Sequence, residues 1–497
     1  MKLLVKYKTE LILISCLIVA YFILRLPNLT LQPIFADEAI YIRWAQVMRA
    51  EPTLRFVSMT DGKTPLFMWL MIPLFKKFSD PLFAGRFLSV MSGFFTLLGV
   101  FFLSKKVFSL KTAFWAALFY VITPYTIFFD RMALVDSMLS GFTIWIIYFA
   151  IWLTKSLRLD VAMILGYLMG GAILVKTPGL INLLILPFSI LSFFQGKRKS
   201  IVKLVILWAV ALGIALVLYN GLRLGPEFNK LSARNADYVF SPQELKGRVL
   251  DPFIPHFHDI SDWFPKLFTI PILLFIGVGI FYVLKKLNGK ALVVLIWAAV
   301  PMLISMVFLK TFTARYLLTS IAPFLVFAGF GLNQLLEKIK MKNFIKITIG
   351  LIIVLPLALW FDFQLLFSPP PLNLPKEERV GYFEEWTAGY GFKEIAQFLL
   401  EKSKTNKVVL GTEGAFGTLP DGLQIYLDKS KISIVTGKAT VSAQLRNAAK
   451  DNLTYFVGNK KRLKGNVSEV ILIKEYPKVK PLDNSFQDSI VLYQVLP

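Results

Sequence analysis

The chain has 497 residues, of which 55 are Lys or Arg and 31 are Asp or Glu, so its formal net charge is +24. Hydrophobic residues make up 56% and charged residues only 17%, against roughly 45–50% and about 25% in soluble globular chains. Such a chain has too little polar surface for a water-soluble particle, and its composition excludes disordered, collagen-like and disulfide-rich proteins. Cys16 is the single cysteine and can form no intrachain disulfide. The composition predicts a polytopic α-helical membrane protein.

Eleven apolar segments approach the length of about 20 residues that a transmembrane helix needs. No small-residue cleavage site follows the first, so we interpret it as a retained span rather than a signal peptide. About 11 transmembrane helices are therefore expected, at about 10–27, 82–103, 112–128, 134–153, 160–175, 178–194, 201–220, 267–284, 291–308, 315–335 and 345–366.

The placement of the basic residues predicts the orientation. With Lys2, Lys6 and Lys8 in the cytoplasm, the inner loops carry sixteen Lys and Arg, and the short outer loops carry four. Positive charge in short loops marks the cytoplasmic side. We therefore expect a multi-pass protein of the cell membrane with a cytoplasmic N-terminus and a C-terminus outside. The net charge reflects this topology, and no nucleic-acid role is predicted.

The composition changes at Pro369-Pro370-Pro371, after which no apolar run is long enough to span a membrane. We expect a transmembrane catalytic domain over residues 1–368, with long outer segments at 28–81 and 221–266, and a soluble extracytoplasmic α/β domain over 369–497. In the second domain we predict a helix over Gly391–Lys402 and strands at Lys407–Gly411, Ile432–Val435, Thr454–Val457, Val470–Ile473 and Ile490–Val495.

The first outer segment contains an acidic pair, Asp37-Glu38, at the start of a predicted interfacial helix. Asp37, Tyr41 and Trp44 stand at i, i+4 and i+7, so they share one face of that helix. Acids at a helix N-terminus also complement the helix dipole, which is a purely structural explanation for the pair.

Other ionisable residues lie close to the predicted outer membrane surface. Groups in such positions are costly and usually have partners or functions, although each alone can be explained structurally, as when an arginine reaches the interface. Their gathering on one side favours an outer site for an anionic lipid-linked substrate. The residues are Lys63, which precedes Thr64-Pro65 and Trp69, then Arg86, Arg131, Asp136, Lys176 and Arg315 beside Tyr316.

In order and orientation over roughly residues 1–340, these segments resemble the GT-C glycosyltransferases. The nearest group is that of the protein O-mannosyltransferases and the lipid A aminoarabinose transferases, glycosyltransferase families 39 and 83. Two departures stand out: Lys63-Thr64-Pro65 replaces a frequent Lys-Pro-Pro, and Arg43 lies farther from Asp37 than the arginine of the aminoarabinose branch.

The resemblance implies transfer of a sugar from a polyprenyl-phosphate donor to a hydroxyl of a protein, lipid or glycan acceptor, with inversion, at the outer face of the bilayer. It implies Asp37 as the base, Glu38 as its neighbour, and Asp136 orienting the acceptor or sharing a metal. It leaves a divalent metal open and implies no other cofactor. Lys63, Arg131 and Arg315 are the implied phosphate-binding cations, with Tyr316, Tyr41 and Arg86 as further substrate contacts.

Two other functions remain open at this point. A transporter or lipid flippase would place ionisable residues near the bilayer midplane and often shows repeated halves, whereas these charges lie at one face and no halves match. A receptor-like protein would depend on its C-terminal domain rather than on Asp37. The pattern His256-x-His258 is only weak evidence for a metal, and Trp386 with Tyr390 forms either a sugar-contact patch or a structural turn.

Overall fold

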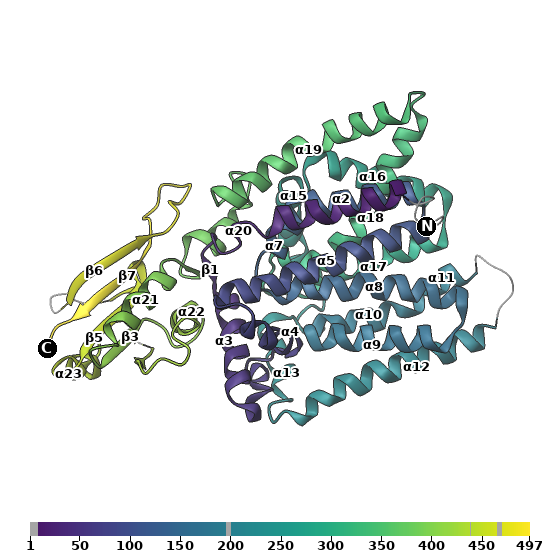
Figure 1. The fold of residues 1–497 in the computed structure, drawn as a ribbon. Helices are drawn as coiled ribbons and strands as arrows, with labels where there is room; N and C mark the ends of the chain where they lie inside the picture. Colours follow the sequence, from purple (N-terminus) through teal and green to yellow (C-terminus); the bar gives the residue numbers. More distant parts are fainter. Residues whose placement is uncertain (1–7, 195–199, 438, 465–469) are drawn as a thin grey trace. The chain divides into compact units, whose positions relative to one another are not determined.

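The computed structural model describes residues 8–194, 200–437, 439–464 and 470–497. The predicted cytoplasmic residues Lys2, Lys6 and 197–199 lie outside this described part. The chain forms two compact units (Figure 1). The first comprises Met1–Pro27, Arg55–Phe67 and Phe87–Pro375, and the second comprises Asn28–Leu54, Met68–Arg86 and Lys376–Pro497.

All eleven predicted spans are helical in the structure. Among the described residues, six helices are long and apolar enough to cross a membrane, and two bent pairs bring the number to eight. The remaining predicted spans are shorter apolar helices, so the fold prediction of a multi-pass helical membrane protein is confirmed. The six are α5 (Pro81–Val107), α8 (Val135–Ser156), α12 (Ile201–Asn220), α17 (Gly289–Phe308), α18 (Leu318–Lys338) and α19 (Asn343–Phe367); the shorter ones are α2 (Lys8–Arg25), α9 (Leu159–Val175) and the segmented stretch η4 (Thr177–Leu180), α10 (Ile181–Ile185), η5 (Leu186–Ser189) and α11 (Ile190–Phe193).

Two predicted spans are bent, and each bend has a local cause. Helices α6 (Leu110–Ile122) and α7 (Pro124–Asp130) meet at 57°, because Pro124 cannot donate a helical hydrogen bond. Helices α15 (Leu250–Phe268) and α16 (Ile270–Lys286) meet at 109°. Between them Thr269 has a positive φ of 72°, so the span expected from residue 267 begins only at Ile270.

Close helix packing positions the start of α18. Gly279 of α16 and Gly331 of α18 each lie so near the other helix that a Cβ atom would collide with the backbone carbonyls of Phe327 and Phe275. Small residues allow such close approach between membrane helices. Because α18 is held against α16 in this way, the short helix η7 (Ala314–Leu317), which directly precedes α18, has a defined position.

The outer segment predicted at 221–266 is ordered and largely helical. It contains η6 (Gly221–Leu224), α13 (Lys230–Ala233), α14 (Asn235–Tyr238) and most of α15. Buried Leu222 and Leu231 pack on Met59 of η2 (Val57–Asp61), which forms a small hydrophobic core. Two segments far apart in sequence are thus joined within the first unit.

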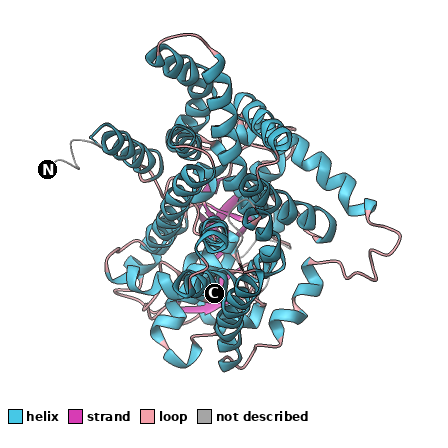
Figure 2. Ribbon diagram, turned by 90° about the vertical axis from the view of Figure 1, so that its right-hand side faces the viewer, coloured by secondary structure: helices cyan, strands magenta, loops and turns pink. Residues whose placement is uncertain are grey.

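The second unit combines short helices with a five-stranded sheet of order β4-β3-β5-β7-β6. Strands β3, β4 and β5 are parallel to one another, and β7 is antiparallel to β5 and β6. All five predicted strands are present, and Figure 2 distinguishes strands (magenta) from helices (cyan). The strands are β3 (Val408–Thr412), β4 (Ser433–Val435), β5 (Leu453–Asn459), β6 (Val470–Pro477) and β7 (Ser489–Val495).

Helix α3 (Ala36–Ala50), the predicted interfacial helix, belongs to this second unit and packs on α22 (Thr418–Gln424). The short antiparallel pair β1 (Ile34–Phe35) and β2 (Ala388–Gly389) fixes its start. The other helices of the unit are η1 (Pro52–Leu54), η3 (Ile72–Lys76), α20 (Lys376–Arg379), η8 (Val380–Glu384), α21 (Phe392–Lys402) and α23 (Ala443–Ala449), while α4 (Leu66–Met71) begins in the first unit and ends in the second.

Candidate active site

The two adjacent acids of α3 lie in different environments. Asp37 occupies the first turn of the helix and is half-buried, whereas Glu38 is fully buried. The Glu38 carboxylate accepts a hydrogen bond from the backbone N–H of Phe35 at 3.0 Å, which satisfies one of the donors at the helix start. The buried Tyr41 packs its ring 6.1 Å from that of Trp44.

Arg86 is the partner of Glu38 within the second unit. Its Nε and Nη2 atoms each lie 2.8 Å from a Glu38 carboxylate oxygen, and both side chains are 0% exposed. The same guanidinium donates to the carbonyl oxygens of Leu29, Gln32 and Pro33 at 2.9–3.1 Å. These contacts hold the Glu38 and Arg86 side chains together beside the start of α3.

In the first unit, the structure brings Asp136 and Lys176 together. Asp136 lies in the first turn of α8, where a negative charge complements the helix dipole, and Lys176 leaves the C-terminus of α9. The Lys176 Nζ lies 2.6 Å from Asp136 Oδ1. The Asp136 side chain is 6% exposed and that of Lys176 23%, so the pair lies at the edge of the protein interior.

The start of α18 adds an aromatic ring and a second cation to this pair. The Lys176 Nζ lies 4.0 Å from the ring centroid of Tyr316, and the Arg315 guanidinium lies 5.3 Å from the same ring. Tyr125 donates a hydrogen bond of 2.5 Å to the Ala314 carbonyl, which holds η7 in place. We call Asp136, Lys176, Arg315 and Tyr316 the helix-end cluster; its two cations and one carboxylate suit an anionic ligand.

Lys63 lies in a different group of residues of the first unit. Its Nζ lies 4.7 Å from the ring centroid of Tyr238, in the segment over residues 221–266. Beside it, Arg234 pairs with Asp61 at 2.6 Å. Lys310 donates a backbone hydrogen bond to the Tyr238 carbonyl at 2.8 Å. The predicted cation Lys63 thus contacts the segment over residues 230–240.

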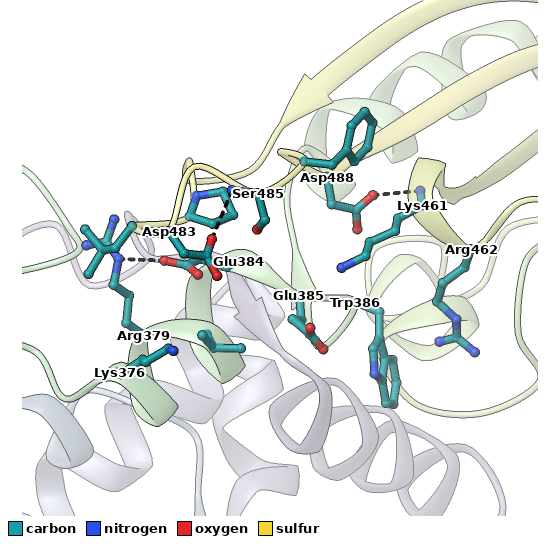
Figure 3. A pocket seen from close by; sticks show the side chains of 14 residues that line it. Lys376, Arg379, Glu384, Glu385, Trp386, Lys461, Arg462, Asp483, Ser485 and Asp488 are labelled. Carbon is teal, nitrogen blue, oxygen red and sulfur yellow. Dashed lines mark hydrogen bonds and ion pairs between the residues drawn. The ribbon is translucent and has the colours of Figure 1, made fainter.

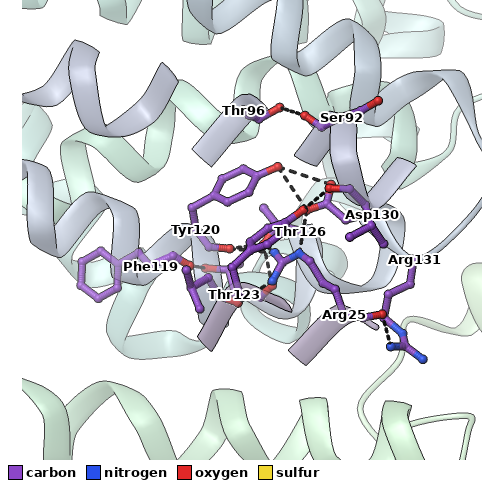
Figure 4. Close-up of polar contacts among 12 residues, drawn as sticks. Arg25, Ser92, Thr96, Phe119, Tyr120, Thr123, Thr126, Asp130 and Arg131 are labelled. Atoms are coloured by element: carbon purple, nitrogen blue, oxygen red, sulfur yellow. Dashed lines mark hydrogen bonds and ion pairs between the residues drawn. The ribbon is translucent and has the colours of Figure 1, made fainter. Parts of the chain in front are cut away.

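Arg131 is fully buried in the first unit, and its Nη1 donates to the carbonyl oxygens of Arg25 and Pro27 at 2.6 and 2.9 Å. These contacts hold the chain where α2 ends. Figure 4 shows its guanidinium apart from that of Arg25, which lies among polar groups of α6 and α7. Arg25 pairs with Asp130 at 3.0 Å and donates to the carbonyl oxygens of residues 120 and 121.

The two histidines of α15 differ in their surroundings. His256 Nδ1 lies 2.7 Å from the Met306 carbonyl oxygen, and its ring stacks on Phe312 with centroids 4.3 Å apart. His258 is exposed. Among the described residues no group of three or more His, Cys, Asp or Glu side chains is arranged to hold a metal ion.

Sequence reasoning missed the buried charges of the helical interior. Arg25 lies at the end of the first apolar run and Asp362 within the last, and both are 0% exposed. An ionisable residue inside an apolar segment was the available signal, because such residues usually have partners. Lys176 was named but left out of the expected site, although it contacts both Asp136 and Tyr316.

Two of three comparisons with known proteins found matches, one to a family sequence model and one to solved structures. Residues 62–220 match the sequence model of the family described as dolichyl-phosphate-mannose-protein mannosyltransferase. In the comparison with curated proteins, no sequence matched.

Among solved structures, the chain is similar to ArnT from Cupriavidus metallidurans bound to undecaprenyl phosphate, with 15% identity, a TM-score of 0.59 and 98% of each chain covered. It is also similar to the oligosaccharyltransferase AglB from Archaeoglobus fulgidus in complex with an inhibitory peptide and a dolichol-phosphate. That match has 13% identity and a TM-score of 0.51, and covers 91% of this chain and 70% of AglB. The superfamily resemblance seen in the sequence is thereby confirmed: the family match and the shared fold support a GT-C superfamily glycosyltransferase.

Proposed function

We propose that the chain transfers a sugar from a polyprenyl-phosphate donor to an acceptor hydroxyl, with inversion, at the outer face of the cell membrane. The observation that carries the proposal is the helix-end cluster, in a chain whose fold matches ArnT bound to undecaprenyl phosphate over nearly its whole length. A lipid phosphate needs cations at the edge of an apolar helical region, and Lys176 and Arg315 stand at helix ends.

In the proposed reaction, the acceptor oxygen forms a bond to the anomeric carbon while the bond from that carbon to the phosphate oxygen breaks. The acceptor proton passes to Asp37, which acts as the general base. Negative charge develops on the leaving phosphate and is stabilised by Lys176 and Arg315, with Lys63 as a further cation. Arginine can bind a phosphate through two parallel hydrogen bonds, whereas lysine acts as a point charge.

The other predicted site residues take supporting roles in this proposal. Asp136 holds the Lys176 ammonium in position. Glu38 and Arg86 secure the helix that carries Asp37, and Arg131 secures the end of α2. The N-terminus is proposed to be cytoplasmic and the C-terminal sheet extracytoplasmic, in agreement with the distribution of lysine and arginine in the sequence.

The test is an assay of the purified protein with a panel of polyprenyl-phosphate sugars, in which free polyprenyl phosphate and the glycosylated acceptor are both measured. Asp37→Asn removes the base and keeps the shape of the side chain. Transfer should fall by about 10²–10⁴-fold, the usual contribution of general base catalysis. Asp160→Asn, at an exposed surface pair with Arg158, is the matched control and should transfer like the wild type.

Two outcomes would count against the proposal. If a well-folded Asp37→Asn variant released polyprenyl phosphate and glycosylated the acceptor at the wild-type rate, Asp37 would not be the base. A purified protein that consumes no polyprenyl-phosphate sugar from the panel would contradict the donor class.

A further inference from the structure

The second unit contains a pocket of about 340 Å³ that the site described above does not use. This volume lies in the lower part of the range of about 300–1,000 Å³ that is typical of ligand pockets. Figure 3 shows Arg379 and Glu384 at one end of the pocket and Trp386 with Arg462 at the other. The pocket joins the turn before β2 to the segments that flank β6 and β7.

One side of the pocket is fixed by the buried lysine Lys478, which is 2% exposed. Its Nζ lies 2.9 Å from Asp488 Oδ2 and donates to the Glu385 carbonyl at 2.8 Å and to Asn459 Oδ1 at 2.5 Å. The backbone directly before Trp386 is therefore anchored by a buried charge. Such anchoring organises a pocket before its ligand arrives.

Trp386 presents a large aromatic ring in this pocket and is 39% exposed. The Arg462 guanidinium lies 4.8 Å from the ring centroid, and its Nε pairs with the buried Glu413 at 2.9 Å. Glu413 therefore holds the Arg462 guanidinium in place, and the guanidinium in turn contacts the Trp386 ring. An exposed but fixed aromatic ring is a surface on which the apolar face of a sugar ring can pack.

The rim of the pocket carries exposed charges of both signs: Lys376, Lys461, Glu385 and Asp483. Lysine ammonium groups donate hydrogen bonds, and carboxylates accept them. Hydroxyl groups do both, so a polyhydroxylated ligand can use every group on this rim. A ligand with charge of one sign would instead meet like charges, which oppose binding.

The pocket is joined by the backbone to the helix that carries Asp37. The Ala36 N–H donates to the Thr387 carbonyl at 3.0 Å, next to the pairing of Phe35 with Ala388. Asp37 and Trp386 are each one residue away from this hydrogen bond. The Cα atoms of Asp37 and Trp386 can therefore be no more than roughly 13 Å apart.

We propose that this pocket binds a saccharide unit of the acceptor, with the sugar ring packed on Trp386 and its hydroxyls bonded by Lys461, Glu385 and Asp483. The inference rests on the proposed function and narrows its acceptor to a glycan or glycolipid. In this arrangement the pocket holds one sugar of the acceptor, and the hydroxyl to be modified lies within reach of Asp37.

The test measures binding without the donor, so that its result is independent of catalysis. The purified full-length protein is applied to an array of neutral, amino-substituted and uronic-acid oligosaccharides, and to an array of hydroxyl-containing peptides as a comparison. The dissociation constant of the best oligosaccharide is then measured for the wild type, Trp386→Ala, Trp386→Phe, Lys461→Ala and the control Lys450→Ala, an exposed residue outside the pocket lining.

The proposal expects at least about tenfold weaker binding for Trp386→Ala, partial rescue by Trp386→Phe, weaker binding for Lys461→Ala, and wild-type binding for Lys450→Ala. Asp37→Asn should bind like the wild type even where it transfers nothing, which separates failure of the pocket from failure of the proposed base. The proposal would be overturned if the protein bound only peptides or bound no oligosaccharide. It would also be overturned if Trp386→Ala and Lys461→Ala both bound the oligosaccharide with wild-type affinity.

Discussion

The neighbouring carboxylates of α3 should respond to amide substitution in opposite ways. Glu38→Gln keeps the size of the side chain and removes its charge, which leaves the Arg86 guanidinium buried without a counter-ion. Both side chains are 0% exposed, and two hydrogen bonds of 2.8 Å join them. Breaking one partner of a buried ion pair costs about 3–5 kcal/mol.

For a unit of this size, each kcal/mol lowers the unfolding midpoint by about 2–4 °C, so Glu38→Gln should unfold about 6–20 °C below the wild type. Asp37→Asn, one residue earlier and half-buried, should unfold close to the wild type while losing transfer. The matched control is Glu401→Gln, which changes the same residue type in the same unit at a pair whose side chains are 69% and 70% exposed.

The assay is thermal unfolding of the purified variants in one detergent, followed by transfer activity per folded molecule. An unfolding midpoint of Glu38→Gln equal to that of Glu401→Gln would refute the assignment of Glu38 to structural support. The same conclusion would follow if Glu38→Gln remained stable and inactive, because that result is expected of a catalytic carboxylate.

Three further predictions concern other charged groups. Lys176→Met should lower transfer at least tenfold in the donor assay, whereas Lys285→Met, at an exposed helix end, should not. Lys478→Met should destabilise the second unit by about 3–5 kcal/mol, because it leaves a buried carboxylate unpaired; hydrogen exchange of β5 and β7 measures this loss. Hydrogen bonds from Ser241 lower the pKa of Glu244 to about 2. The stabilisation of residues 241–249 by the ionised carboxylate should therefore be complete above about pH 4.5 and lost as the pH falls towards 2. Hydrogen exchange of these residues measures the loss.

The helices and strands were predicted well from the sequence, because each is marked by a run of apolar residues of characteristic length. Apolar runs identified all eleven helical segments, and shorter apolar runs such as Lys407–Gly411 identified the strands, here β3 at Val408–Thr412. Bends were not predictable from hydropathy, since Pro124 and Thr269 alter the backbone without altering the apolar character of the run.

The partners of the charged residues were much harder to predict. Arg86 and Glu38 are 48 residues apart in sequence, and Lys176 and Asp136 are 40 apart. Position near a predicted membrane surface indicated that these groups matter, but pairing depends on which helices pack together. For this reason Glu38 belonged to the site expected from the sequence, whereas in the structure its carboxylate contacts Arg86 and the Phe35 backbone.

The C-terminal sheet cannot be removed without disturbing α3, which gives a last prediction. Gln46 of α3 donates to the Ile425 carbonyl at 2.8 Å, and Arg49 pairs with Asp428 at 2.6 Å. Strand β2, which pairs with β1 at the start of the helix, would be lost as well.

Deletion of 369–497 should therefore abolish transfer even if the domain bound no ligand, because the helix carrying Asp37 would lose its partners. The informative comparison is Trp386→Ala in the full chain, which changes the pocket and leaves the contacts of Gln46 and Arg49 in place. If that variant keeps the folded state but needs more acceptor for half-maximal transfer, the domain binds acceptor as well as supporting α3. An unchanged acceptor dependence would leave the domain with structural support alone.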